Sequence, residues 1–369
     1  MLSNISEPLI TTLSAHLRLS KSRLETLVKL LLLLVNVRTV NLTHIAAQFS
    51  SSAKPASSYR RLQRFFQFVR LDAAWLARVI VQALNIRPPW ILCLDRTNWK
   101  FGKRNVNILM LAIVTSRVRI PLMWAMLDKQ GASNCAERIA LLQRYLDIFG
   151  ADSIRHLLAD REFVGQKWMG FLIKNKIMFS IRVKGKTYVR FAGGAICMLQ
   201  TFARNRNTWA RLRSLPACFA TMPESLGHPL RFACKRLKNG EMLFIVTNSD
   251  EPLQAMNVYK RRWFIECLFA DSKSRGMNLE DTAMTDTEKL STLLAIVTLA
   301  MVFSYACARK LPRRQRSRKG PHGYPRKSCF RTGFDALRNW IIHDANAVIA
   351  LWKEIWKRHK SDLAGKGVV

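Results

Sequence analysis

Apolar side chains recur at helical spacing through the first 88 residues, where Leu, Val and Ala are periodic and strand-like alternation is absent. Two helices separated by a turn stand out in this part of the chain. The first is Leu42–Phe49, the turn contains Ser and Pro, and the second helix is Ala56–Val69, capped by Ser57 or Ser58. The hydrophobic pattern therefore predicts a helical N-terminal region that includes a helix, a turn and a helix.

The second of these helices is rich in arginine. Arg60, Arg61 and Arg64 are followed by aromatic residues that can anchor the helix, namely Phe65, Phe66 and Phe68. A helix, a turn and a basic helix are typical of modules that read DNA. The alternative is an ordinary helical bundle whose arginines are solvated. We favour DNA contact by Arg60, Arg61 and Arg64.

The apolar pattern changes after Pro88 and Pro89, because consecutive prolines cannot continue a helix. Three strands, a helix, a strand, a helix and a strand are then expected. In order, these elements are Trp90–Asp95, Val106–Thr115, Val118–Leu127, Ala136–Phe149, Ile154–Asp160, Gly165–Asn175 and Met178–Val183. This order is similar to that of a ribonuclease H-like fold, an α/β fold with a mixed sheet and flanking helices. Such a fold carries one Asp on its first strand and another at the end of its fourth, the places of Asp95 and Asp160.

Short possible strands among basic turns follow and predict a β-rich insertion over residues 185–255. The sheet domain then resumes, and Leu290–Ala308 reads as an apolar core helix. A basic segment without acidic residues, Arg309–Arg331, precedes a last helical stretch, Phe334–Arg358. We therefore expect a helical DNA-binding region at 1–88, a catalytic core at 89–184 and 256–308, the insertion at 185–255, and a basic helical C-terminal region at 309–369.

The charge balance narrows the class of partner. Sixty Lys and Arg against 24 Asp and Glu give a net charge of +36, while 49% hydrophobic content agrees with a folded protein. A compact chain with so much like charge repels itself, so a polyanion is the expected partner, and nucleic acid is favoured. A solvated basic surface, ribosome association and an anionic membrane are the alternatives.

The eight cysteines occur singly, without a CxxC pair or paired histidines at metal-ligand spacing. They indicate small buried residues in a reducing compartment rather than disulfides or a zinc site. The strongest apolar run, Leu30–Val35, is far shorter than the ~20 residues that span a bilayer. We expect a cytoplasmic protein with no membrane anchor.

The stretch Tyr259–Lys273 carries the most informative pattern. On a helix, Tyr259, Arg262, Glu266 and Lys273 form one polar stripe about 21 Å long. The opposite side is apolar and suited to packing. Asp271 lies on the same helix but points away from the stripe.

Three acids can converge in this arrangement: Asp95, Asp160 and Glu266. Mg²⁺ prefers oxygen ligands, and two such ions roughly 4 Å apart activate an attacking hydroxyl and stabilise a leaving oxygen. Phosphodiester cleavage follows from this chemistry, with Mn²⁺ expected to substitute and no organic cofactor. Glu162 is a candidate supporting residue, and His156 reads as a core histidine.

The spacing Tyr-x2-Arg-x3-Glu-x6-Lys at 259–273 resembles the signature of bacterial insertion-sequence DDE transposases of the group called IS-four. LDRTNWKFG at Asp95, ADREFVG at Asp160, GMNLEDT after the stripe and RKSCFRTGFDALR near the C-terminus resemble further motifs of that family. The resemblance extends from about residue 40 to 345.

This resemblance implies an enzyme that binds double-stranded DNA at terminal inverted repeats, cuts it and joins the 3′ end to target DNA. It implies that Asp95, Asp160 and Glu266 hold the metal ions and that Tyr259, Arg262 and Lys273 contact the DNA backbone. It also implies release through an end hairpin, a dimer that bridges two ends, and an aromatic residue of the insertion that stacks on an extruded base. Trp209 is the candidate for that residue, with a core role equally open.

Two other functions fit the same residues. One is an inactive copy that binds DNA without cutting it. The other is a structure-selective nuclease on the same fold, which would cut DNA and never join a 3′ end to a target.

Overall fold

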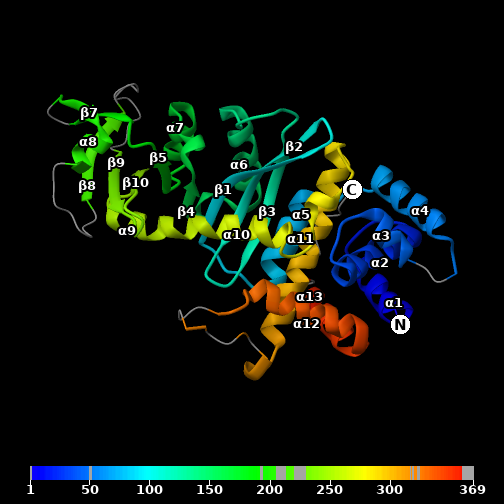
Figure 1. Ribbon diagram of the computed structural model, residues 1–369. Coiled ribbons are helices and arrows are strands. Elements are labelled where there is room, and N and C mark those ends of the chain that lie inside the picture. Colours follow the sequence, from blue (N-terminus) through cyan, green and yellow to red (C-terminus); the bar gives the residue numbers. More distant parts are fainter. Residues whose placement is uncertain are drawn as a thin grey trace.

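The computed structural model describes residues 2–49, 52–191, 194–204, 213–219, 230–315, 317, 320–321 and 325–359. Helices from the two ends of the chain gather at one side of the molecule, and a long β-sheet extends away from them (Figure 1). One long helix, α11 (Thr287–Lys310), runs between the two parts. The fold is therefore a mixed α/β sheet with helical regions from both termini.

Five helices form the N-terminal region, as the hydrophobic pattern predicts. The apolar run of α2 is buried because α1, α3, α4, α11 and the C-terminal helix α12 all pack against it. Asn41 caps α3 by accepting a hydrogen bond from the Thr43 N–H, and Asp72 caps α5 through the Trp75 N–H. The five helices are α1 (Leu2–Ser14), α2 (Lys21–Val37), α3 (Leu42–Ala47), α4 (Pro55–Phe68) and α5 (Ala73–Ala83).

The central sheet has the strand order β3-β2-β1-β4-β5. Strand β2 is antiparallel to β1 and β3, whereas β4 and β5 run parallel to β1. This is the ribonuclease H-like arrangement. The elements are β1 (Trp90–Phe101), β2 (Arg104–Val114), β3 (Arg119–Met126), α6 (Cys135–Phe149), β4 (Ile154–Ala159), α7 (Gln166–Lys174) and β5 (Phe179–Val183).

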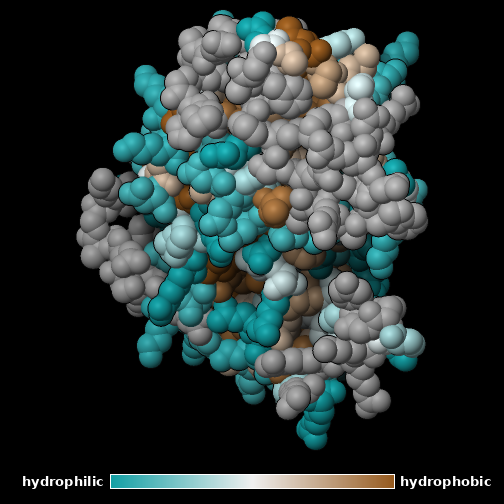
Figure 2. All heavy atoms as spheres, turned by 90° about the vertical axis from the view of Figure 1, so that its left-hand side faces the viewer, coloured by the Kyte–Doolittle hydropathy of each residue, from teal (hydrophilic) through white to brown (hydrophobic). Residues whose placement is uncertain are grey.

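The strands of the insertion continue this sheet. Strand β10 pairs antiparallel with β5 at one edge, and β9, β8, β6 and β7 follow outward. The described side chains on the face seen from this end are mainly hydrophilic (Figure 2). The inserted elements are β6 (Tyr188–Phe191), β7 (Ile196–Met198), α8 (Leu199–Arg204), β8 (Arg213–Phe219), β9 (Arg231–Arg236) and β10 (Met242–Thr247).

After the insertion, α9 (Pro252–Tyr259) and α10 (Trp263–Ser272) return along the sheet, and α12 (Cys329–His343) and α13 (Ala345–His359) complete the helical side. Among the described residues, α11 is the one helix long and apolar enough to cross a membrane, and 94% of its most apolar window is buried inside the protein. It contacts α2, α5, α12, α13 and β3. Helix α11 is therefore positioned as a core helix that joins the sheet to the helical side.

Candidate active site

Two strand pairings place Asp95 and Asp160 beside each other. The parallel register of β1 and β4 ends with the pair Leu94 and Ala159, and each Asp is the next residue of its strand. Neighbouring strands lie about 4.8 Å apart, so the two acids emerge at the same level of the sheet. Parallel pairing, together with equal distance from the last pair, therefore brings together residues 65 positions apart.

The prediction that the first strand ends at Asp95 is wrong. Strand β1 continues to Phe101 because it forms a hairpin with β2, turning at Gly102 with φ of 56°. Beyond Asp95 the strand has β2 as its neighbour, since the pairing with β4 stops at Leu94. Asp95 thus lies at the end of the β4 pairing rather than at the end of its strand.

The polar stripe is not one continuous α-helix. Tyr259 ends α9, a 3-10 turn covers Lys260–Arg262, and α10 carries Glu266. Arg262 lies between two of the three acids. Its Nη1 is 3.4 Å from Asp95 Oδ2, and its Nη2 donates a hydrogen bond to Glu266 Oε1. This guanidinium links the stripe to the sheet.

Burial controls the electrostatics of these groups. Desolvation raises the pKa of Asp95 to about 6, although the Arg96 N–H and the Arg262 charge act in the opposite direction. Burial alone would lower the pKa of Arg262, but Tyr259, Glu266 and Asp160 outweigh it and the pKa is raised. Arg262 is therefore a permanent cation among carboxylates.

The donor set fits a hard divalent cation. Asp95, Asp160 and Glu266 offer carboxylate oxygens, the ligands such a cation prefers, and Asp160 Oδ1 is buried with no hydrogen-bond partner among the described residues. As they are placed, no three Asp, Glu, His or Cys side chains among the described residues lie close enough to hold one ion together. The Arg262 guanidinium supplies positive charge between Asp95 and Glu266 instead.

The other two stripe residues have different surroundings. Tyr259 is buried, and its hydroxyl is without a hydrogen-bond partner among the described residues. Lys273 Nζ lies 2.6 Å from Glu280 Oε1, 3.5 Å from the Asn98 carbonyl oxygen and 5.4 Å from the centre of the Trp99 ring. Lys273 therefore reaches the part of β1 that lies beyond Asp95.

An ion pair between Arg96 and Glu162 lies beside the acids. Arg96 donates two hydrogen bonds to Glu162, from Nε at 3.3 Å and from Nη2 at 3.2 Å, and its backbone N–H donates to Asp95 Oδ1 at 2.7 Å. The expected supporting role of Glu162 agrees with this contact. The sequence prediction did not include Arg96. The feature that could have indicated it is a cationic residue directly after Asp95.

Two further side-chain predictions are confirmed. Asp271 points away from Asp95 and Asp160, toward Arg119 at 3.9 Å. His156 is a core histidine, 3% exposed, and its Nε2 is 2.8 Å from Ser180 Oγ.

The three arginines of the predicted DNA-reading helix differ. In α4, Arg61 donates to Glu25 and Thr26 of α2, so it holds two helices together. Arg60 and Arg64 are exposed. Phe65 and Phe66 are buried as expected, whereas the prediction that Phe68 anchors the helix is wrong, since it is 62% exposed.

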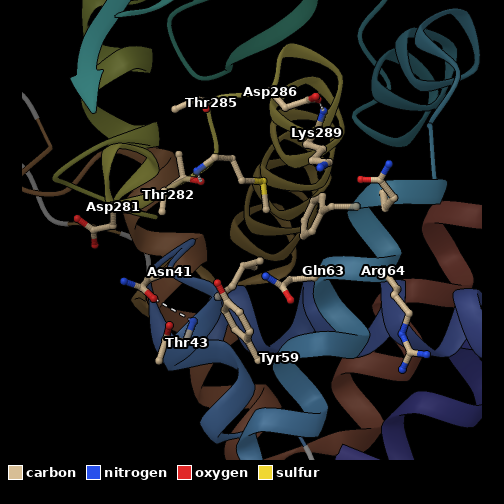
Figure 3. A pocket seen from close by; sticks show the side chains of 15 residues that line it. Asn41, Thr43, Tyr59, Gln63, Arg64, Asp281, Thr282, Thr285, Asp286 and Lys289 are labelled. Atoms are coloured by element: carbon tan, nitrogen blue, oxygen red, sulfur yellow. Dashed lines mark hydrogen bonds between the residues drawn. The ribbon is translucent and has the colours of Figure 1, made fainter. Parts of the chain in front are cut away.

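A groove of about 610 Å³ separates α4 from the loop that leads into α11 (Figure 3). Gln63, Arg64 and Gln67 of α4 line one wall, and Asp286 and Lys289 lie on the other. Together with Arg60, the three residues of α4 form an exposed polar face of arginine and glutamine. These side chains can donate hydrogen bonds to base edges.

Trp209, the candidate for stacking, lies outside the described residues. A different tryptophan has the exposure that stacking requires. Trp263 follows Arg262 directly and is 60% exposed. The sequence pattern did not single it out, because Trp263 is not one of the four polar residues of the stripe.

The chain was compared with known protein families, curated sequences and solved structures. No curated protein sequence matches the chain. Among solved structures, the cryo-EM structure of a piggyBac transposase synaptic complex with hairpin DNA matches at a TM-score of 0.48 and 11% identity, over 99% of this chain and 80% of that one. The family model described as the transposase DDE domain matches residues 86–303. That match covers more than half of the sequence and includes Asp95, Asp160 and Glu266, and the chain belongs to the transposase DDE domain family.

Proposed function

We propose that this protein is a DNA transposase of an insertion sequence. It binds the terminal inverted repeats of its element, cuts the DNA there and joins the freed 3′ end to target DNA. The observation that carries the proposal is the adjacency of Asp95 and Asp160 beyond the last β1–β4 pair, with Glu266 linked to Asp95 through Arg262. Membership of the transposase DDE domain family supports it.

In this proposal Asp95, Asp160 and Glu266 hold two divalent ions, Mg²⁺ with Mn²⁺ as a substitute. When bound, the ions activate the attacking hydroxyl and stabilise the leaving oxygen. Arg262 and Lys273 contact phosphates of the DNA strand, since Arg262 lies beside Asp95 and Lys273 reaches Asn98 on the same strand. Arg96 holds Glu162 and the Asp95 carboxylate in place through its side chain and backbone N–H.

Tyr259 is proposed to donate a hydrogen bond from its hydroxyl to the same strand. Its hydroxyl has no partner among the described residues, and burial raises its pKa, so the proton stays on the oxygen. A neutral donor positioned by α9 adds a hydrogen bond without altering the charge of the site.

The helix α4 is proposed to read the terminal repeats. Its exposed face carries Arg60 and Arg64, with Gln63 and Gln67 between and beyond them. Arginine recognises guanine and glutamine recognises adenine through paired hydrogen bonds in the major groove. Arg61 is proposed to stabilise this helix from within, through its pair with Glu25.

The family resemblance also supports an end hairpin and a dimer that bridges two DNA ends. Trp263 is the residue we propose to stack on a base displaced near the cut, because its ring is exposed beside Arg262. Stacking on an aromatic ring is worth about 1–3 kcal/mol per base. Trp263→Ala should weaken binding of a mismatched DNA end, where the base is free to leave the stack, more than binding of a paired one. Equal losses on the two DNAs would exclude stacking.

The direct test is cleavage of duplex DNA that carries the terminal repeats of the element, in the presence of Mg²⁺. Each of Asp95→Asn, Asp160→Asn and Glu266→Gln should reduce cleavage by roughly a hundredfold or more, since each removes an oxygen ligand worth several kcal/mol in the transition state. DNA binding should persist in all three variants.

Asp147→Asn serves as the control, because Asp147 is an exposed acid of α6. Wild-type cleavage by any of the three active-site variants would reject the assignment. Strand transfer is scored in the same reaction: cutting without joining identifies a nuclease, and binding without cutting by the wild type identifies an inactive copy.

A further inference from the structure

A second cationic site lies on the other side of α10 from the candidate active site. A pocket of about 380 Å³ is enclosed by the C-terminal half of α10, the first residue of β3 and the segment that leads into α12. Cys267, next to Glu266, and Asp271 form its floor on α10. Five of its lining side chains are cations: Arg119, Arg275, Arg326, Lys327 and Arg331.

The acids near the pocket do not balance these cations. Asp271 lies 3.9 Å from Arg119, and Asp335 pairs with Lys327 at 2.8 Å and Arg331 at 2.9 Å. Arg275 and Arg326 are both exposed, and no carboxylate of the described residues is within ion-pair distance of either. The pocket therefore has spare positive charge and open access.

The start of α12 adds to this charge. Ser328 caps the helix, and its Oγ accepts a hydrogen bond from the Arg331 N–H. The first turn carries no acid and is flanked by Lys327 and Arg331. Cations at the positive end of a 15-residue helix are unfavourable for the helix dipole, and a bound anion removes that penalty.

We propose that this pocket binds a backbone phosphate of DNA outside the phosphodiester that reacts, and that it helps to hold the DNA across the active site. This inference rests on the proposed function. Arginine side chains and backbone N–H groups suit phosphate oxygens. The motif RKSCFRTGFDALR, which the active site leaves without a role, supplies Arg326, Lys327 and Arg331.

Position favours DNA over a free anion. Asp271 is five residues beyond Glu266, about 7 Å along the helix axis, and it lies on the opposite side of a helix about 10 Å wide. Successive phosphates of one strand advance about 3.4 Å along duplex DNA, so a segment of several base pairs spans both sites.

The test measures how DNA affinity depends on salt. The double variant Arg275→Ala with Arg326→Ala should reduce the slope of log Kobs against log[NaCl] by about 0.9, the value for one phosphate contact. The matched control is Arg155→Ala with Lys174→Ala. It removes two exposed cations, one from the start of β4 and one from the end of α7, away from Asp160.

A slope unchanged in the pocket variant, or reduced equally in the control, overturns the proposal. Asp335→Asn provides a second variant that keeps the pocket cations intact. It frees Lys327 and Arg331 from their acid, so the slope should become steeper, and an unchanged slope counts against the pocket.

Inorganic phosphate distinguishes the source of the ligand. If phosphate raises the thermal midpoint of the wild type but not of the Arg275→Ala, Arg326→Ala variant, while the DNA slopes agree, the pocket is a free-anion site and the DNA assignment fails. Binding is measured without cleavage. A wild-type protein that never cuts DNA therefore refutes the proposed function separately from the pocket.

Discussion

At the scale of single residues, Arg262 is the centre of the site. Its side chain is 13% exposed and contacts carboxylates from a strand and from the helix that follows it. A buried charge depends on its partners, and removal of one partner leaves the other unpaired at a cost of about 3–5 kcal/mol. The guanidinium that stabilises the free protein is the same one that we propose contacts DNA.

The first prediction concerns this pair. Arg262→Gln should lower the free energy of unfolding by about 3 kcal/mol, because Asp95 is left as a buried carboxylate without its cation. In an Asp95→Asn background the loss should be smaller, giving a coupling energy of at least about 1 kcal/mol in a double-mutant cycle. The exposed pair Arg231 and Asp250, at 3.2 Å, is the control and should couple by less than that. Additive losses for Arg262 and Asp95 would contradict the contact.

The second prediction follows from His156. Burial lowers its pKa to about 4, below the ordinary value of 6.5. The unfolded chain therefore binds the proton first as pH falls, so the stability that this residue contributes is present above pH 6.5 and is lost between 6.5 and 4. The expected loss is on the order of 3 kcal/mol.

Thermal midpoints at pH 7.5 and 5 measure this effect in the wild type and in His156→Gln. The variant keeps a polar partner for Ser180 and has no titrating group. The difference between the two proteins isolates His156 from Asp95, whose raised pKa acts with opposite sign because the folded state takes up the proton first. Parallel pH profiles would show that His156 does not titrate as its burial implies.

At the scale of elements, the close crossing of α11 and α12 determines where the C-terminal region lies. Gly333 of α12 sits against the backbone of α11 at Ser304, and a Cβ atom there would overlap the Ser304 carbonyl oxygen. A backbone oxygen cannot rotate away as a side chain can. Glycine at this position therefore lets the two helices approach each other and brings the start of α12 to its place beside α10.

The third prediction tests this crossing. Gly333→Ala should destabilise the protein by about 3 kcal/mol, since the two helices must separate to admit the methyl group. Gly165→Ala is the matched control, because a Cβ atom at Gly165 has nothing within 4 Å and the φ angle of 171° is extended. Thermal unfolding of both variants provides the comparison. Equal midpoints would mean that α11 and α12 are not in close contact.

At the scale of the whole molecule, charge dominates. A net charge of +36 on 369 residues opposes compaction. Ion pairs such as Arg61–Glu25 and Arg182–Glu241 add local attraction, but the cations outnumber the acids and most of them have no acid to pair with. The excess is distributed over α4, the active-site rim and the pocket at the start of α12. Cations at these places agree with the proposed binding of DNA.

The fourth prediction is that salt stabilises this protein. Raising NaCl from about 50 mM to 500 mM shortens the Debye length and screens the repulsion, so the thermal midpoint should rise by several degrees. An equal osmolarity of sucrose is the control for effects unrelated to charge. A midpoint that falls with salt would show that attractive ion pairs outweigh the net repulsion.

The sequence alone determined the local elements and marked the residues of the candidate site. Periodicity defined the N-terminal helices and the order of the strands, because side-chain spacing directly encodes helix and strand. It also marked Asp95, Asp160 and Glu266, and correctly turned Asp271 away from them, because direction around a helix follows from residue number.

Tertiary structure decided what those residues meet. Arg262 and Asp95 are 167 positions apart, and their contact depends on how α10 packs on the sheet. The same holds for Arg61, which the sequence could not distinguish from Arg60 and Arg64 until α2 placed Glu25 beside it. Spacing along the chain specifies the direction of a side chain, whereas its partners and exposure arise from packing between distant segments.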